Sequence, residues 1–348
     1  MGDLATRLEI TKLARELGVP EDGLAFLADR TPADVKELRA AAAHAVFSRN
    51  EERVKRLAAL SRMLPVPLTA KIAEHALGPM LSARVAVALD PREAVRLAGH
   101  LTPAFLARLA VSLDPARVAP IVQSLPDDLV VDVGRRLLDA GEHLPLGRFV
   151  AVVSPAVALR VVDGAAGHDL LQVALFTDEP AALEAIVGAL PDARLAEIVR
   201  AAADDDAYDA AVSLLLPLSE ESCARLVAQV EVLDDHARAA VVEAIAAHDV
   251  WPAVLPALHA VDGVHLAGLV NVPATLDVAV VDRVVDHARA LDLAPVLVQL
   301  VLGFDDAHLD VLRDSKRLRD PDLQDWLVTS AGVSGRLVVP VLESLGLR

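Results

Sequence analysis

The sequence predicts an all-α fold, a right-handed α-solenoid of short antiparallel helical hairpins, with about 12 residues per helix and about 24 per repeat. Three observations support this fold class. Residues 78–137 repeat with a period of twelve, a turn-forming pair opens each unit, and a leucine closes each unit. Apolar or small residues recur inside a unit with the i, i+3, i+4, i+7 spacing of one helix face.

Each unit carries the signals of a helix start. A side-chain oxygen comes directly before a proline in four places: Asp90-Pro91, Thr102-Pro103, Asp114-Pro115 and Ser154-Pro155. The oxygen accepts a hydrogen bond from a free N–H of the first turn, and proline at the first helical position has no N–H to leave unpaired. Helices of about ten residues are marginal alone, because nucleation is costly. We therefore expect successive helices to reverse at short turns and to stack as hairpins.

The repeat divides the chain into three predicted regions. Residues 1–62 do not follow the period and are interpreted as an N-terminal helical cap, because the terminal repeats of a solenoid need a polar outer face. Residues 63–203 form the regular short-helix repeats. Residues 204–348 are expected to continue the same solenoid with divergent, longer helical repeats.

Composition narrows the kinds of partner. The net charge of −17, from 50 acidic against 33 basic residues, argues against binding to nucleic acid. The single cysteine, Cys223, provides neither a disulfide framework nor a metal-site spacing, which favours a reducing, cytoplasmic location. The charged N-terminus is unlike a secretory signal. Prolines and a glycine divide the most apolar stretch, 250–276, into pieces too short to span a membrane, so we predict no membrane span.

The sequence lacks the well-marked catalytic motifs. It contains no Gly-rich phosphate loop, HExxH, CxxC, GxSxG or EF-hand loop, which predicts a protein that is not an enzyme and has no cofactor. Pairs of aspartates occur at turns, for example Asp234-Asp235. Helix capping and the helix dipole explain them, and weak Mg²⁺ binding is the alternative. No residue set identifies a metal site.

Histidines are enriched in one part of the chain. Five of the eleven lie between residues 236 and 287. His248, His259 and His265 flank successive turns near Trp251, where they would line one end of a groove as polar anchors. We take these four residues as candidate ligand-binding residues. The alternative is that the histidines are half-exposed residues at hairpin ends.

Residues 250–304 are more apolar than a solenoid surface requires. The segment 293–302 is hydrophobic almost all round, which predicts a helix that is buried on every side. Three interpretations are open for this region. It forms an inner helix of the solenoid, a homodimer contact, or the wall of a groove for an apolar small molecule.

Two turns carry a motif that points to a known family. Residues 89–94 read Leu-Asp-Pro-Arg-Glu-Ala, and residues 113–118 read Leu-Asp-Pro-Ala-Arg-Val. The first matches an L-D-P-x-x-A turn in full, and the second matches it except for Val118 in the last place. With these turns, the chain from about Leu64 to Ala203 resembles the intracellular N domain of MgtE-type magnesium transporters. The resemblance implies an α-superhelix of short hairpins and, as one functional alternative, a response to Mg²⁺. The chain shows no CBS-like pattern and no transmembrane helices, so transport is not implied.

The sequence therefore predicts a non-enzymatic scaffold that binds a protein partner through a concave surface. One alternative is a soluble carrier or sequestering protein for an apolar small molecule, held in a groove near 250–304. A further alternative is an Mg²⁺-responsive regulator.

Overall fold

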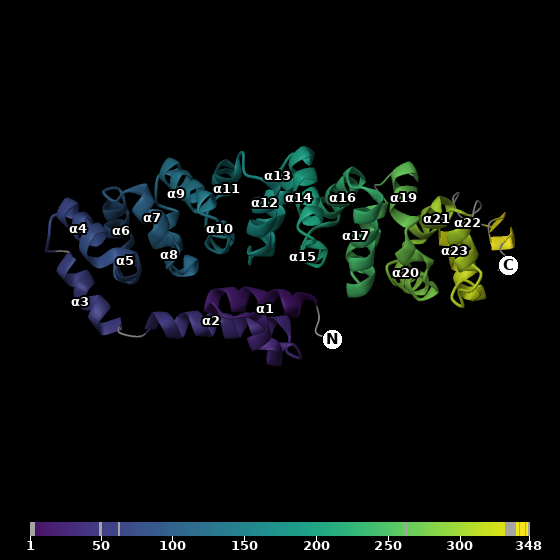
Figure 1. Ribbon diagram of the computed structural model, residues 1–348, viewed down its shortest axis with the longest axis horizontal. Helices are drawn as coiled ribbons and strands as arrows, with labels where there is room; N and C mark the ends of the chain where they lie inside the picture. Colours follow the sequence, from purple (N-terminus) through teal and green to yellow (C-terminus); the bar gives the residue numbers. More distant parts are fainter. Residues whose placement is uncertain are drawn as a thin grey trace. The chain divides into compact units, whose positions relative to one another are not determined.

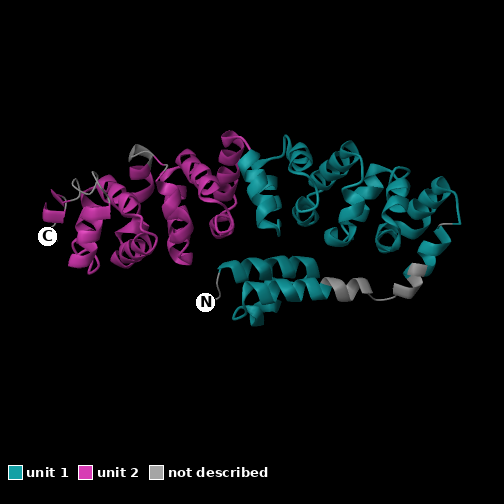
Figure 2. Ribbon diagram, turned by 180° about the vertical axis from the view of Figure 1, so that it is seen from behind, with its two compact units in different colours: residues 1–189 teal, residues 190–348 magenta. Residues whose placement is uncertain are grey.

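The computed structural model describes residues 4–48, 51–61, 63–259, 261, 263–330, 339–340, 342–344 and 346. This described chain is helical, with no strand, and its helices pack on their neighbours along the sequence. The predicted all-α helical repeat is thereby confirmed. Two compact units are present, residues 1–189 and residues 190–348, coloured separately in Figure 2.

Unit 1 begins with a helical hairpin and continues into short repeats. Its helices, of which the α-helices are labelled in Figure 1, are α1 (Leu4–Leu17), η1 (Glu21–Leu27), α2 (Pro32–Ser48), α3 (Glu51–Ser61), α4 (Val66–Ile72), η2 (Ala73–Leu77), α5 (Gly78–Ala88), α6 (Pro91–Ala98), α7 (Pro103–Ala110), α8 (Pro115–Val122), α9 (Asp127–Asp139), α10 (His143–Val150), α11 (Pro155–Val162), α12 (Gly167–Leu175) and α13 (Pro180–Ala189).

The predicted helix starts in the regular repeats are confirmed. Helices α6, α7, α8 and α11 each begin at the expected proline and are capped by the residue before it. The side chains of Asp90 and Thr102, for example, accept hydrogen bonds from the N–H groups of Arg92 and Phe105. Helices two places apart pack together, so that α5, α7, α9, α11 and α13 form one layer. The pairs α4 and α6, α6 and α8, and α10 and α12 pack in the second layer.

Close approach between α10 and α12 depends on Gly147. A Cβ atom at this position would lie 2.6 Å from the backbone carbonyl carbon of Phe176 and 2.7 Å from the carbonyl oxygen of Val173. Real side chains do not tolerate such distances, so only glycine fits here. Gly147 therefore permits the close approach of these two helices.

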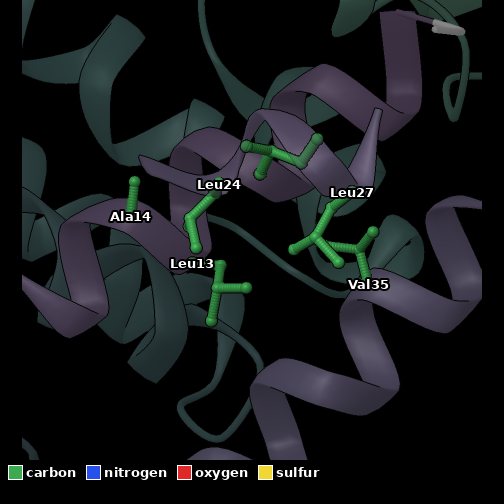
Figure 3. Packing of buried hydrophobic residues seen from close by; sticks show 6 residues of the cluster. Leu13, Ala14, Leu24, Leu27 and Val35 are labelled. Atoms are coloured by element: carbon green, nitrogen blue, oxygen red, sulfur yellow. The ribbon is translucent and has the colours of Figure 1, made fainter. Parts of the chain in front are cut away.

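The N-terminal hairpin has a hydrophobic core of its own. Helix α1 ends at Leu17, and Gly18 follows with a positive φ of 65°, which starts the turn into η1. The buried residues that join α1, η1 and α2 include those in Figure 3: Ile10, Leu13, Ala14, Leu24, Leu27 and Val35. Because these side chains face one another, the hairpin is a separate packing module within unit 1.

Helix α3 lies where a cap on the first repeats is expected. Val54 and Ala58 on α3 share a buried cluster with Val85 and Leu89 at the end of α5 and with Ala94 on α6. Helices α1 and α2, by contrast, make their contacts with the repeats at α10, α12 and the turn that follows α12. The predicted N-terminal cap thus contains two parts. Helix α3 packs on α5 and α6, whereas the hairpin of α1 and α2 contacts α10, α12 and the turn after α12.

Unit 2 contains longer repeats of three helices each. Its helices are α14 (Asp192–Asp204), α15 (Tyr208–Ser213), α16 (Glu220–Ala228), η3 (Gln229–Val232), α17 (Asp235–His248), α18 (Trp251–Leu258), α19 (Gly263–Val270), η4 (Pro273–Leu276), α20 (Val278–Ala290), α21 (Ala294–Gly303), α22 (Asp306–Leu312) and α23 (Pro321–Ser330).

An interval of 43 residues relates the repeats of unit 2. Asp206, Asp249 and Asp292 each follow a long helix and have left-handed backbones, with φ of 53°, 54° and 56°. Aspartate is among the few residues that tolerate this conformation. Two of these carboxylates also bind the next repeat, since His287 Nε2 lies 3.0 Å from Asp249 Oδ1 and Trp326 Nε1 donates to Asp292 Oδ1 at 2.9 Å. These contacts explain why positions 249 and 292 carry aspartate rather than glycine.

The apolar segment 250–304 lies largely in the core of unit 2. The buried residues of α21 are Ala294, Val296, Leu297, Val298, Leu300 and Val301. Helix α21 packs on α18, α19, α20 and α23, which covers it from several sides. The inner-helix interpretation accounts for this composition. Within the described residues, none of the helices combines the length and apolar character that crossing a membrane requires.

Candidate functional site

An ion cluster holds the N-terminal hairpin against the repeats of unit 1. We call it the Asp178 network; its members are Glu9, Lys12, Glu16, Arg39 and Asp178. Arg39 binds Asp178 through both terminal nitrogens, at 2.9 and 3.0 Å. The same nitrogens contact Glu16 at 2.9 Å and Glu9 at 3.0 Å, and Lys12 Nζ lies 3.1 Å from Asp178. Two-pronged arginine–carboxylate contacts of this type are strong and fix the orientation of both groups.

Three elements supply the network. Glu9, Lys12 and Glu16 share one face of α1, because residues separated by three and four positions lie above one another on a helix. Arg39 projects from α2. Asp178 lies in the turn between α12 and α13, and is 139 residues away from Arg39 in the sequence. The network is therefore a tertiary contact between the hairpin and the repeats.

The network is buried, and each of its charges is paired. The side chains of Lys12 and Arg39 are only 5% and 6% exposed. Arg148 of α10 adds a further cation 3.6 Å from Glu16, and it also lies 3.9 Å from Asp114. Buried charges are tolerated when they are paired in this way.

The electrostatic surroundings favour the charged forms of both central groups. Burial acts to raise the pKa of Asp178, but the hydrogen bond from Arg39 and the charge of Lys12 outweigh it and hold the pKa below its ordinary value. Burial acts to lower the pKa of Arg39, and the contacts with Asp178, Glu9 and Glu16 raise it instead. Each pKa shift reflects a stabilised ion pair.

Further contacts extend the surface around Asp178. Lys36 Nζ donates to the Asp178 carbonyl oxygen at 3.2 Å, and Arg15 donates to Gln172 at 3.3 Å. The Arg15 guanidinium also lies 4.8 Å from the ring centre of Phe176, which is a cation–π distance. We define the docking face by the repeat residues that contact the hairpin: Arg148, Gln172, Phe176 and Asp178.

The predicted ligand-binding residues lie in unit 2, and of the four only His248 has a described polar side-chain contact. His248 Nε2, at the end of α17, is 2.9 Å from Asp209 of α15. Trp251 begins α18 and is 6% exposed, and its Nε1 is buried with no hydrogen-bond partner among the described residues. His259 is exposed at the end of α18. His265 belongs to α19, and its side chain lies outside the described residues. Their role in ligand binding stays a prediction.

Two further observations bear on metal binding. His143 Nε2 lies 2.8 Å from Asp169, and the rings of His143 and His168 meet edge to face. Across the part of the chain that the structure describes, no three His, Cys, Asp or Glu side chains are arranged as metal ligands would be.

Sequence reasoning did not identify the docking face. Charged residues on a helix face are usually solvated, so Lys12 and Arg39 gave no reason to expect burial. One signal was available in the hairpin. Each of its helices carries a Lys-x-x-Arg pattern, at Lys12 to Arg15 and at Lys36 to Arg39.

The structure defines the chain as an all-helical repeat protein whose first unit holds its own N-terminal hairpin. Comparison with protein-family models, with curated proteins and with solved structures finds no match. The resemblance of residues 64–203 to the MgtE N domain therefore stays a prediction.

Proposed function

We propose that this chain is a non-enzymatic helical-repeat scaffold, and that the docking face of unit 1 binds a helical segment of a protein partner. The observation that carries the proposal is the hairpin itself. The docking face already binds two helices through a buried network of ion pairs centred on Asp178. A surface that orders Lys12 and Arg39 in this way has the chemistry to order the same groups on another protein.

The chemistry of the face suits a protein helix. It offers a carboxylate, an amide, an aromatic ring and a backbone carbonyl within one short segment, 172–178, and Arg148 beside them. Long cationic side chains on a helix can reach all of these groups. Nucleic acid, as a polyanion, would meet Asp178 unfavourably. Cys223, the single cysteine of the sequence, is buried and forms no disulfide, which is compatible with the cytoplasmic location that we propose.

The alternatives have weaker support. The carrier of an apolar small molecule was suggested by residues 250–304, whose apolar side chains are accounted for by packing within unit 2. The buried, unpaired Nε1 of Trp251 is the feature that a polar group on such a ligand would satisfy. The Mg²⁺-responsive regulator rests on the family resemblance and on acidity. Equal melting temperatures in Mg²⁺ and in Na⁺ at matched ionic strength would remove it.

The proposal is tested with the hairpin supplied as a separate molecule. In the full-length Arg39→Glu variant, repulsion from Asp178 should release the attached hairpin and leave the docking face free. A fluorescent synthetic peptide of residues 4–42 is then expected to bind with a Kd of about 10 µM in an anisotropy titration. Adding Asp178→Ala to the same protein should abolish binding. A peptide that does not bind the Arg39→Glu protein would contradict the proposal.

A further inference from the structure

The hairpin is attached to the repeats by ionic contacts, and another molecule can replace such contacts. Helix α3 shares an apolar cluster with α5 and α6, including Val54, Ala58 and Val85. The hairpin instead keeps its apolar residues for its own core (Figure 3) and reaches the repeats with long charged side chains. An ionic contact can be exchanged for an equivalent one without opening either hydrophobic core, so the hairpin can leave as a unit.

The hairpin presents the same pattern twice. Lys12 and Arg15 on α1 contact Asp178, Gln172 and the ring of Phe176. Lys36 and Arg39 on α2 contact the carbonyl and the carboxylate of Asp178. In each pair the lysine and the arginine are three residues apart, so both lie on one side of their helix. The docking face is thus occupied by two helices that each carry Lys-x-x-Arg.

The bound hairpin does not satisfy every group at the contact. Arg39 Nε is buried, and no acceptor among the described residues lies within hydrogen-bonding reach of it. A buried donor left unpaired is unfavourable, because it has lost its hydrogen bonds to water without replacement. A partner arginine that occupies this position and also pairs its Nε would recover that cost. The intramolecular contact is therefore open to competition.

We infer that the docking face recognises a basic helix carrying Lys-x-x-Arg, and that the N-terminal hairpin is a built-in competitor that keeps this face closed. This inference rests on the proposed function and adds the partner's chemistry and its regulation. A tethered segment has an effective concentration of about 1 mM. Against a contact with a Kd of about 10 µM, tethering lowers the affinity for a free competitor about 100-fold.

The test compares three full-length proteins that bind one peptide. The peptide of residues 4–42 is expected to bind wild-type protein about 100-fold more weakly than the Arg39→Glu protein. Arg7→Glu is the matched control, since it makes the same charge change at an exposed position on α1 and should behave as wild type. Circular dichroism verifies that all three proteins are folded.

The outcomes separate the two proposals. Equal, measurable affinity for wild-type and Arg39→Glu protein would overturn the competitor role and leave the scaffold function standing. A second peptide, in which Lys12, Arg15, Lys36 and Arg39 are all glutamine, should not bind the Arg39→Glu protein. If it binds as well as the first, the Lys-x-x-Arg recognition is overturned. Failure of the first peptide on the Arg39→Glu protein would instead contradict the scaffold function itself.

Discussion

Replacing Gly147 with alanine is expected to lower the free energy of unfolding by about 3 kcal/mol. The added Cβ would lie 2.6 Å from the backbone of Phe176 and 2.7 Å from the carbonyl oxygen of Val173. A flexible side chain can rotate away from such a clash, whereas these backbone atoms cannot. Helices α10 and α12 must therefore move apart, which opens the layer that they form. Urea unfolding followed by circular dichroism measures the loss.

A second glycine provides the matched control. Gly188 lies in α13, and a Cβ atom there would meet nothing within 4 Å. Alanine has a higher helix propensity than glycine, so Gly188→Ala is expected to be neutral or to stabilise the protein by up to about 1 kcal/mol. If Gly147→Ala behaves like Gly188→Ala, the close packing of α10 on α12 is wrong.

Removing the Asp178 carboxylate should release the hairpin rather than unfold the protein. In Asp178→Ala, Arg39 and Lys12 lose the carboxylate that joins them to the repeats and keep only Glu9 in common. Losing one partner of a buried ion pair costs about 3–5 kcal/mol. Release of the hairpin returns both cations to water and limits that cost. Once released, the hairpin is held only by its own core, so its helices open more often than when they are docked on the repeats. Amides of α1 and α2 are therefore expected to exchange with deuterium about 100-fold faster, as about 3 kcal/mol implies.

Which amides exchange faster in Asp178→Ala is as informative as how much faster they exchange. Exchange within unit 2 should not change in Asp178→Ala, because the network lies entirely in unit 1. Asp163→Ala is the control, since Asp163 is 82% exposed and its contact with Arg135 is long, at 4.0 Å. Unchanged exchange of α1 and α2 in Asp178→Ala would mean that the network does not hold the hairpin.

Local chemistry made the short repeats of unit 1 predictable. Asp90, Thr102, Asp114 and Ser154 each cap a helix whose first residue is the following proline, and both signals lie in adjacent residues. The end of α1 is a local feature of the same kind, because Gly18, which has a positive φ, follows the helix directly. Such features depend on a few neighbouring residues, so one sequence is enough to find them.

The other features of the fold and of the docking face depend on residues that are far apart in the sequence. The interval of 43 residues in unit 2 is visible in Asp206, Asp249 and Asp292, but a search for a twelve-residue period passes over it. The docking face joins Arg39 to Asp178, and no local pattern indicates which distant carboxylate a surface arginine will meet. Lys12 is buried because the same contact brings the hairpin against the repeats. These features need the three-dimensional structure.

The distance between the hairpin and the repeats tests the central claim most directly. Spin labels are placed at Val19→Cys in the hairpin and Asp163→Cys in the repeats, both exposed positions, while the native Cys223 is buried. Pulsed electron paramagnetic resonance should give one narrow distance distribution at low salt. Adding Arg39→Glu should broaden it. A broad distribution without Arg39→Glu, or a narrow one that Arg39→Glu leaves unchanged, would contradict docking through the Asp178 network.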